Sequence, residues 1–127
     1  MHRVVRVFTV LLGLVLALPF ALRWLFAPEA MAAEQNITLF GPSALSHMRG
    51  DTGGAFFAVG VLAVLGVFRK EPGYLEAVAL IMAGIVAGRL YGIAVDGFDP
   101  RVGVAMAVEI AIAAVTYTTA RQLRSDA

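Results

Sequence analysis

The sequence predicts an all-α fold, that of a polytopic membrane protein built as a four-transmembrane-helix bundle. Of the 127 residues, 60% are hydrophobic and only 15% are charged, and the mean hydropathy is +0.83. These values lie far from those of a typical soluble domain. At about 20 residues per crossing, this length allows four spanning helices with short connections. We therefore expect residues 1–127 to form a single membrane domain.

The first helix is predicted over residues 7–27, after a short basic start. Pro19 lies inside this helix and predicts a kink. The alternative is a cleavable leader, because a basic start, an apolar run and the small residues at 30–33 resemble a processing signal. Arg23 and Trp24 interrupt the approach to that cleavage site, and the run is long enough to span a membrane. We therefore expect the helix to be retained.

Residues 28–42 are predicted to form the one long extramembrane loop, because they are mixed in character and contain two prolines. A short interfacial helix is expected over about residues 30–35. The second spanning helix is predicted over 43–68, since Pro42 suits a first turn and Ser43 offers a capping hydroxyl.

The last two spanning helices are predicted over 74–95 and 101–120. A charged turn at 69–73 separates the second helix from the third, and a turn at 96–100 separates the third from the fourth. The polar tail at 121–127 then leaves the membrane. The result is four hydrophobic helices with both ends of the chain on one side.

Lys and Arg residues gather on the side of the predicted bundle that holds the chain ends and the second turn. These residues are Arg3, Arg6, Arg69, Lys70, Arg121 and Arg124. Short cytoplasmic segments hold the excess of Lys and Arg in membrane proteins, so both termini are predicted to be cytoplasmic. Arg23, Arg49 and Arg101 lie on the outer side and count against this orientation.

Two helices carry a charge at nearly the same depth in the outer half of the bundle. Arg89 lies seven residues before Asp96, which places it about 10 Å below the outer boundary. Glu109 lies eight residues after Arg101, about 12 Å in from the same boundary. An unpaired charge at a helix centre costs at least about 2.5 kcal/mol on insertion scales. Glu109 is therefore the predicted partner of Arg89.

Both residues also have a purely structural interpretation. Arg89 is about two turns from the surface, and its long side chain can snorkel toward the headgroups without any function. Glu109 can be a protonated acid that joins two helices through one hydrogen bond.

Six charged residues of the outer half make up the candidate site: Arg23, Arg49, Asp51, Arg89, Asp96 and Glu109. In a ligand pocket, desolvation would keep Glu109 neutral, so that it could donate a proton, with Asp51 or Asp96 as the base. These three acids are the catalytic candidates. Arg49 and Arg89 would orient an anionic group of the ligand.

Five glycines are candidates for close helix packing. Gly84, Gly88 and Gly92 repeat at intervals of four within 74–95, a spacing of small residues that lets a neighbouring backbone approach closely. Gly53 and Gly60 offer similar positions in the second helix. We expect these positions to serve helix contacts, within the chain or in a homo-oligomer.

Several classes of function are disfavoured by composition. The chain has no cysteine, which excludes disulfides, thiolate metal sites and dithiol redox chemistry. A net charge of +1 without a basic block makes nucleic acid an unsuitable partner. No phosphate-binding glycine loop or hydrolase motif is present. We predict no metal and no cofactor.

Three fragments together carry a resemblance to a known family: Arg49-Gly50-Asp51-Thr52-Gly53-Gly54, Gly88-Arg89-Leu90 leading to Asp96-Gly97, and Glu109. They resemble an uncharacterised bacterial family of small four-helix membrane proteins that is similar to the wider DoxX-like group. The likeness spans about residues 5–120. Asp51 and Thr52 stand where the family more often has Glu and an aromatic residue, so the acid is kept and any role of the aromatic is in doubt. The resemblance implies a bacterial inner membrane location and no established reaction.

Three hypotheses of function follow. The charged residues line a pocket that binds or modifies a hydrophobic small molecule or lipid; this hypothesis is favoured slightly, because six charged groups are many for a brace. Alternatively, they brace a structural or accessory subunit that stabilises a membrane protein partner. Proton-coupled transport is a weaker alternative, because so short a chain would have to oligomerise. Whether the protein is an enzyme stays open.

Overall fold

The computed structural model describes all 127 residues, and the chain is helical with no strand. Four helices are long and apolar enough to cross a membrane: His2–Phe26, Gly41–Phe68, Pro72–Asp96 and Pro100–Ser125. They extend the predicted helices by one to five residues at most ends. The predicted all-α class with four spanning helices is confirmed.

The first span consists of α1 (His2–Val15), the π-helical turn η1 (Leu16–Phe20) and α2 (Ala21–Phe26). Pro19 lies inside η1. Because proline has no N–H and its ring crowds the carbonyl of the preceding turn, the helix cannot keep its regular hydrogen bonds there. A wider π-helical turn therefore stands where the sequence predicts a kink.

A short helix, α3 (Pro28–Glu34), follows the first span and corresponds to the predicted interfacial helix. The second span consists of α4 (Gly41–His47), the π-helical η2 (Met48–Gly54) and α5 (Ala55–Phe68). Pro42 lies in its first turn as expected, but Ser43 makes no capping hydrogen bond. The predicted capping role of Ser43 is wrong because the helix begins two residues earlier, which places this hydroxyl inside the first turn.

The last two spans are the single helices α6 (Pro72–Asp96) and α7 (Pro100–Ser125). Each has a proline in its first turn, where the missing N–H costs no hydrogen bond. Between them, Gly97 has a φ of +98°, a backbone conformation that glycine adopts without strain. The Asp99 side chain then accepts a hydrogen bond of 2.7 Å from the backbone N–H of Arg101. These residues make the tight turn that holds α6 and α7 antiparallel.

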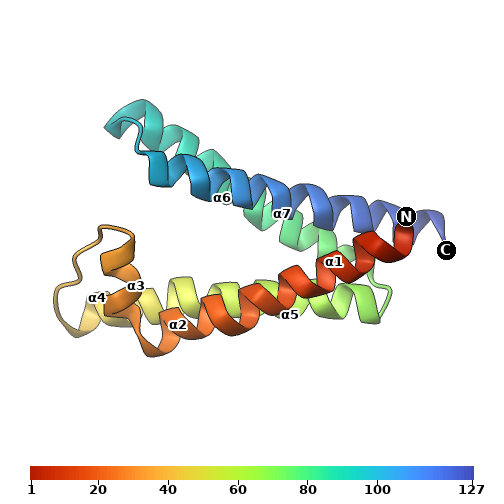
Figure 1. Ribbon diagram of the computed structural model, residues 1–127, viewed down its shortest axis with the longest axis horizontal. Coiled ribbons are helices and arrows are strands. Elements are labelled where there is room, and N and C mark those ends of the chain that lie inside the picture. Colours follow the sequence, from red (N-terminus) through yellow and green to blue (C-terminus); the bar gives the residue numbers. More distant parts are fainter.

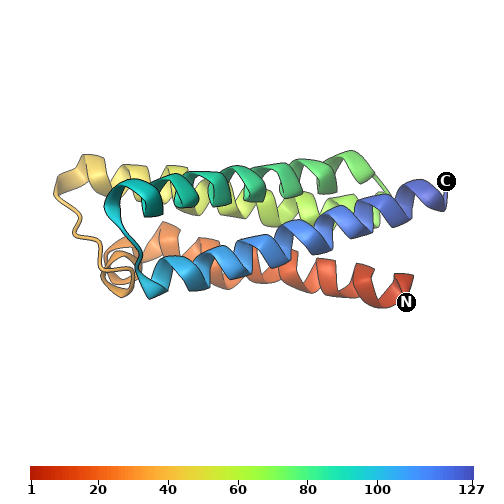
Figure 2. The ribbon, with the colours of Figure 1, turned by 90° about the horizontal axis from the view of Figure 1, so that it is seen from above.

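The four spans form two helical hairpins, one of α1, α2 and α5 and the other of α6 and α7 (Figure 1). Both chain termini lie at one end, which we call the termini end. The segment between α3 and α4 and the turn between α6 and α7 lie at the other, the loop end (Figure 2). The hairpins meet near the termini end and diverge toward the loop end (Figure 1).

The main core lies where the hairpins meet, and every span contributes to it: Leu16, Val59, Ala63, Val78, Met82 and Ile112. Near the termini end, Thr9 of α1 and Thr119 of α7 share a buried hydrogen bond of 2.8 Å. Arg124 of α7 makes two hydrogen bonds to Glu76 of α6. Apolar packing and the Thr9–Thr119 bond hold the two hairpins together at this end, whereas the Arg124–Glu76 contact joins the two helices of the second hairpin.

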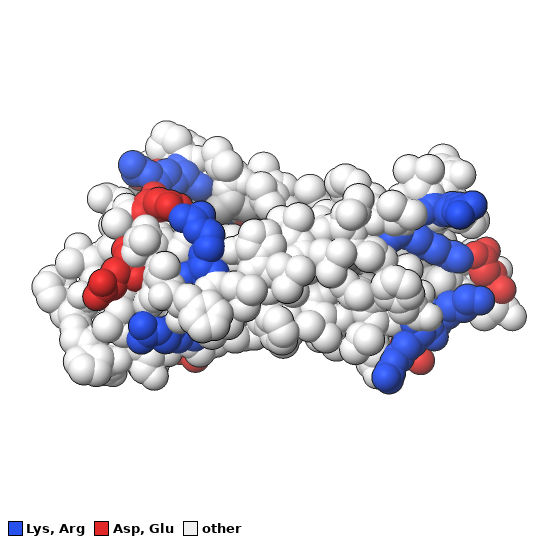
Figure 3. All heavy atoms as spheres, turned by 60° about the horizontal axis from the view of Figure 1, so that its bottom comes forward, with Lys and Arg blue, Asp and Glu red and all other residues white.

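Charged side chains gather at the two ends of the molecule. On the face that Figure 3 shows, an uncharged band separates the charges of the loop end from those of the termini end. A membrane-spanning protein has this distribution because its hydrocarbon-facing belt must be apolar, whereas its ends meet water and headgroups.

The five candidate packing glycines divide into two groups. A Cβ added at Gly60 would lie 2.5 Å from the Gly13 carbonyl oxygen, and one at Gly53 would lie 3.0 Å from the Leu25 side chain. These two positions let the helices of the first hairpin approach closely. In the second group, a Cβ at Gly84, Gly88 or Gly92 would meet nothing within 4 Å.

The orientation of the second group follows from helical geometry. Gly84 lies two residues after the buried Met82, which is about 200° around the helix. Gly84 therefore faces away from the core, and at none of the three positions does a neighbouring side chain or backbone pack against the glycine as closely as at Gly60. A contact of these three glycines with a second chain stays a prediction.

Candidate functional site

The side chains of α6 and α7 that face the first hairpin form two seams with regular helical spacing. On α6, the buried residues Leu75, Val78 and Met82 are followed at the same spacing by Ile85 and Arg89. On α7, a separate series of buried residues comprises Glu109, Ile112, Thr116, Thr119 and Leu123. Because seams with this spacing stay on one face of a helix, Arg89 and Glu109 continue the core toward the loop end.

Arg89 and Glu109 form a two-pronged ion pair at the position where the main core ends. The Arg89 Nε donates hydrogen bonds to both carboxylate oxygens of Glu109, at 3.0 and 2.8 Å, and Nη2 donates one of 2.8 Å to Oε1. The Glu109 side chain is 7% exposed and that of Arg89 is 36% exposed. The pair is thus shielded on the acid side and accessible on the guanidinium side.

This geometry tests two expectations about the pair. Glu109 is the partner that the depth argument predicts for Arg89, and the guanidinium bonds to it instead of snorkelling to the surface. Both carboxylate oxygens accept hydrogen bonds, and such paired bonds are typical of an ionised acid. The arrangement therefore favours a charged Glu109 over the neutral proton donor predicted from the sequence.

The other predicted site residues do not join this pair. The three predicted residues of the first two spans bond to nearby residues of those spans or of α3: Arg23 to Glu34, Asp51 to His47 at 2.8 Å, and the Arg49 Nε to the Leu25 carbonyl at 3.0 Å. Asp96 is exposed and makes no ion pair. The expectation of one connected charged cluster is therefore wrong. The physical reason is the divergence of the hairpins, which separates the charges of α2 and η2 from those of α6 and α7.

Aromatic side chains of the first hairpin lie next to the core where it ends. Phe20 and Phe56 are in edge-to-face contact, with ring centroids 5.1 Å apart, and both contact the main core. Trp24 is only 4% exposed and packs with Met31 and Ala32. Its indole Nε1 is buried without a hydrogen-bond partner.

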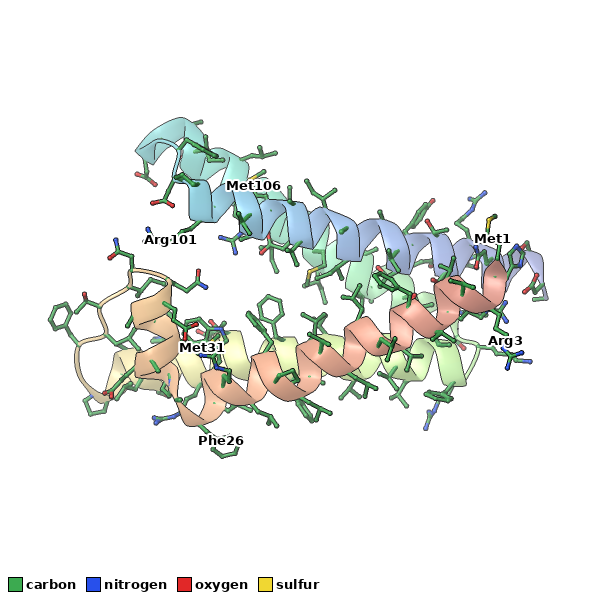
Figure 4. All side chains as sticks on the ribbon, viewed as in Figure 1. Met1, Arg3, Phe26, Met31, Arg101 and Met106 are labelled. Atoms are coloured by element: carbon green, nitrogen blue, oxygen red, sulfur yellow. The ribbon has the colours of Figure 1, made fainter.

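Two residues near this region were not expected there. Trp24 lies near the end of the first span and is buried; its spacing of four from Phe20, and of eight from Leu16, is the sequence signal that places it on the core-facing side. Arg101 was counted only as an outer basic residue. Figure 4 shows Arg101 extending from the start of α7 on the side of the first hairpin. No three or more His, Asp or Glu side chains are grouped closely enough to hold a metal ion.

One comparison with known proteins gives a match. The family model described as Domain of unknown function (DUF4345) matches residues 4–120, almost the whole chain. No curated protein matches the chain, and no solved structure matches it.

Proposed function

Because the chain belongs to the family described as Domain of unknown function (DUF4345), which names no activity, we propose a function from the geometry of the Arg89–Glu109 pair. The protein binds a hydrophobic small molecule or a lipid that carries an anionic group. The anionic group lies against the Arg89 guanidinium where the hairpins diverge, and the hydrophobic part lies along the apolar side chains nearby.

One observation carries this proposal: the Arg89 guanidinium keeps free donors although it is paired. Nε and Nη2 bond to Glu109, whereas Nη1 donates no hydrogen bond. Its two N–H groups can therefore bind an anionic oxygen without breaking the ion pair. The 36% exposure of this side chain leaves the guanidinium accessible, and Glu109 fixes its orientation.

The test is to identify what co-purifies with the protein and with its Arg89→Met variant. After extraction in mild detergent, mass spectrometry should detect an anionic lipid or small molecule with the wild type, and the variant should lose most of it. Arg121→Met is the matched control, because Arg121 is exposed at the termini end and its loss removes the same charge. Equal retention by the wild type and both variants would contradict the proposal.

The second candidate function is a brace in a structural or accessory subunit. It is favoured by the three hydrogen bonds that join α6 to α7 through the pair. A brace alone predicts that the folded Arg89→Met variant binds the same lipids as the wild type. It also predicts that a partner protein is lost from the complex when the hairpin is weakened.

For the location, we extend the proposal to a bacterial inner membrane with both termini in the cytoplasm. The basic residues at the termini end support this orientation. The loop end, with the Arg89–Glu109 pair below it, then belongs to the outer half of the membrane. The fragments around Asp51, Arg89 and Glu109 support a relation to the DoxX-like group.

A further inference from the structure

A second possible binding region lies at the loop end of the first hairpin, away from the Arg89–Glu109 pair. It is a cavity of about 650 Å³ formed by the end of α2, the start of α3, Leu39, α4 and η2. Its lining includes the apolar residues Leu25, Leu39 and Leu45 and the polar residues Glu29, Ser46 and Arg49. No residue of α6 or α7 contributes to it.

The cavity carries one positive and one negative side chain that are not paired with each other. Arg49 is held by the hydrogen bond from its Nε to the Leu25 carbonyl, which leaves both terminal nitrogens of its guanidinium without a partner. Glu29 makes no hydrogen bond and no ion pair. Both side chains are exposed. The cavity thus offers separate sites for an anion and a cation.

The position of the cavity in the fold adds a second constraint. The first membrane-length helix ends beside the cavity, at Phe26, and the second begins beside it, at Gly41. A ligand here would have its polar group at the level of the lipid headgroups. The three leucines would contact the apolar part that follows.

We propose that this cavity binds a zwitterionic phospholipid headgroup, a phosphate joined by a short linker to a primary ammonium, as in phosphatidylethanolamine. The Arg49 guanidinium binds the phosphate, because its planar set of N–H donors matches phosphate oxygens. The Glu29 carboxylate accepts hydrogen bonds from the ammonium. This site goes beyond the function proposed for Arg89 and uses none of its residues.

The test measures lipid binding by native mass spectrometry of the purified protein, with phosphatidylethanolamine or phosphatidylglycerol added to the detergent. Because phosphatidylglycerol has no ammonium, the wild type should prefer phosphatidylethanolamine. Arg49→Gln should weaken phosphatidylethanolamine binding by about tenfold, which is about 1.4 kcal/mol. Glu29→Gln should abolish the preference between the two lipids and leaves the Arg49 hydrogen bond to Leu25 in place.

Arg101→Gln is the matched control, because Arg101 is an exposed arginine at the same end that does not line the cavity. Equal binding of both lipids by the wild type, or equal losses in Arg49→Gln and Arg101→Gln, would overturn the proposal. Displacement of the lipid by an equal concentration of soluble glycerophosphoethanolamine would overturn the assignment to a lipid in favour of a soluble zwitterion. Loss of Arg89 should leave this binding unchanged, so the two proposals fail separately.

Discussion

At the scale of single residues, the Arg89–Glu109 pair is the feature with the largest expected effects. Charges inside a membrane protein are costly, and removing one partner of a buried pair leaves the other uncompensated. The two partners differ in exposure, at 36% for Arg89 and 7% for Glu109. An unpaired Arg89 can move toward water, whereas an unpaired Glu109 cannot. The two single substitutions should therefore differ in cost.

We expect Arg89→Met to destabilise the protein more than Glu109→Gln does. The first substitution leaves a buried acid unpaired, at a cost of about 3 kcal/mol. The second leaves a guanidinium that can reach water by snorkelling, so it costs less. The double variant should recover much of the larger loss, because neither charge remains. Thermal unfolding in detergent measures all three. Losses that simply add in the double variant would show that the two side chains are not coupled.

At the scale of helices, the first hairpin depends on a contact between backbones. A Cβ at Gly60 would lie 2.5 Å from the Gly13 carbonyl oxygen and 2.6 Å from the Ala17 nitrogen. Neither atom belongs to a flexible side chain, so α1 and α5 would have to separate to admit even a methyl group. Small residues at helix crossings in membranes permit this approach, and the closely packed surfaces then stabilise the pair.

Gly60→Ala should therefore lower the free energy of unfolding by about 1 to 3 kcal/mol, the usual cost of overpacking. Gly84→Ala is the matched control, because a Cβ there meets nothing within 4 Å. Alanine is also the better helix former, so the control should be neutral or slightly stabilising. Thermal unfolding of the two variants is the measurement. Equal destabilisation by both would rule out the close contact of α1 with α5.

At the scale of the whole molecule, two hairpins are joined at one end and diverge at the other. The termini end has apolar packing from all four spans and the buried Thr9–Thr119 hydrogen bond. Toward the loop end, the seam of α6 and α7 ends in charged residues, and these do not contact charges of the first hairpin. Water and lipid should therefore reach deeper into the molecule from the loop end than from the termini end.

The orientation can be tested with single cysteines, because the chain has none of its own. Phe98→Cys lies in the turn between α6 and α7, where Phe98 is 66% exposed, and Ser125→Cys lies at the end of α7. A membrane-impermeant thiol reagent added to intact cells should label the first and spare the second until the cells are opened. The reverse pattern would invert the proposed orientation.

The same reagent should report the divergence of the hairpins. Gly92→Cys and Ala105→Cys lie on the loop-end side of the Arg89–Glu109 pair, whereas Ala113 lies beyond it and contacts the main core. We expect labelling at the first two positions and none at Ala113→Cys. If none of the three cysteines is labelled, lipid or protein must exclude water from the space near Arg89. This result would favour the brace over the ligand site.

The sequence by itself determined the all-α class, the four membrane-length helices and the partner of Arg89. The composition indicates that the chain lies in a membrane. The apolar runs predict the helices, and the prolines and charged turns between them predict where each helix begins and ends. The depth argument could pair Arg89 with Glu109 because a tight turn makes α6 and α7 antiparallel neighbours, which relates depth directly to sequence position.

Only the tertiary structure decided which other charges meet and which glycines pack. Arg49 and Asp51 lie in η2, toward the loop end of their span, but the divergence of the hairpins keeps them from Arg89. Gly84, Gly88 and Gly92 have the spacing of a packing stripe, yet a Cβ at any of them would meet nothing within 4 Å. Depth and spacing can be worked out along one helix, whereas the angle between two hairpins depends on how all four spans pack together.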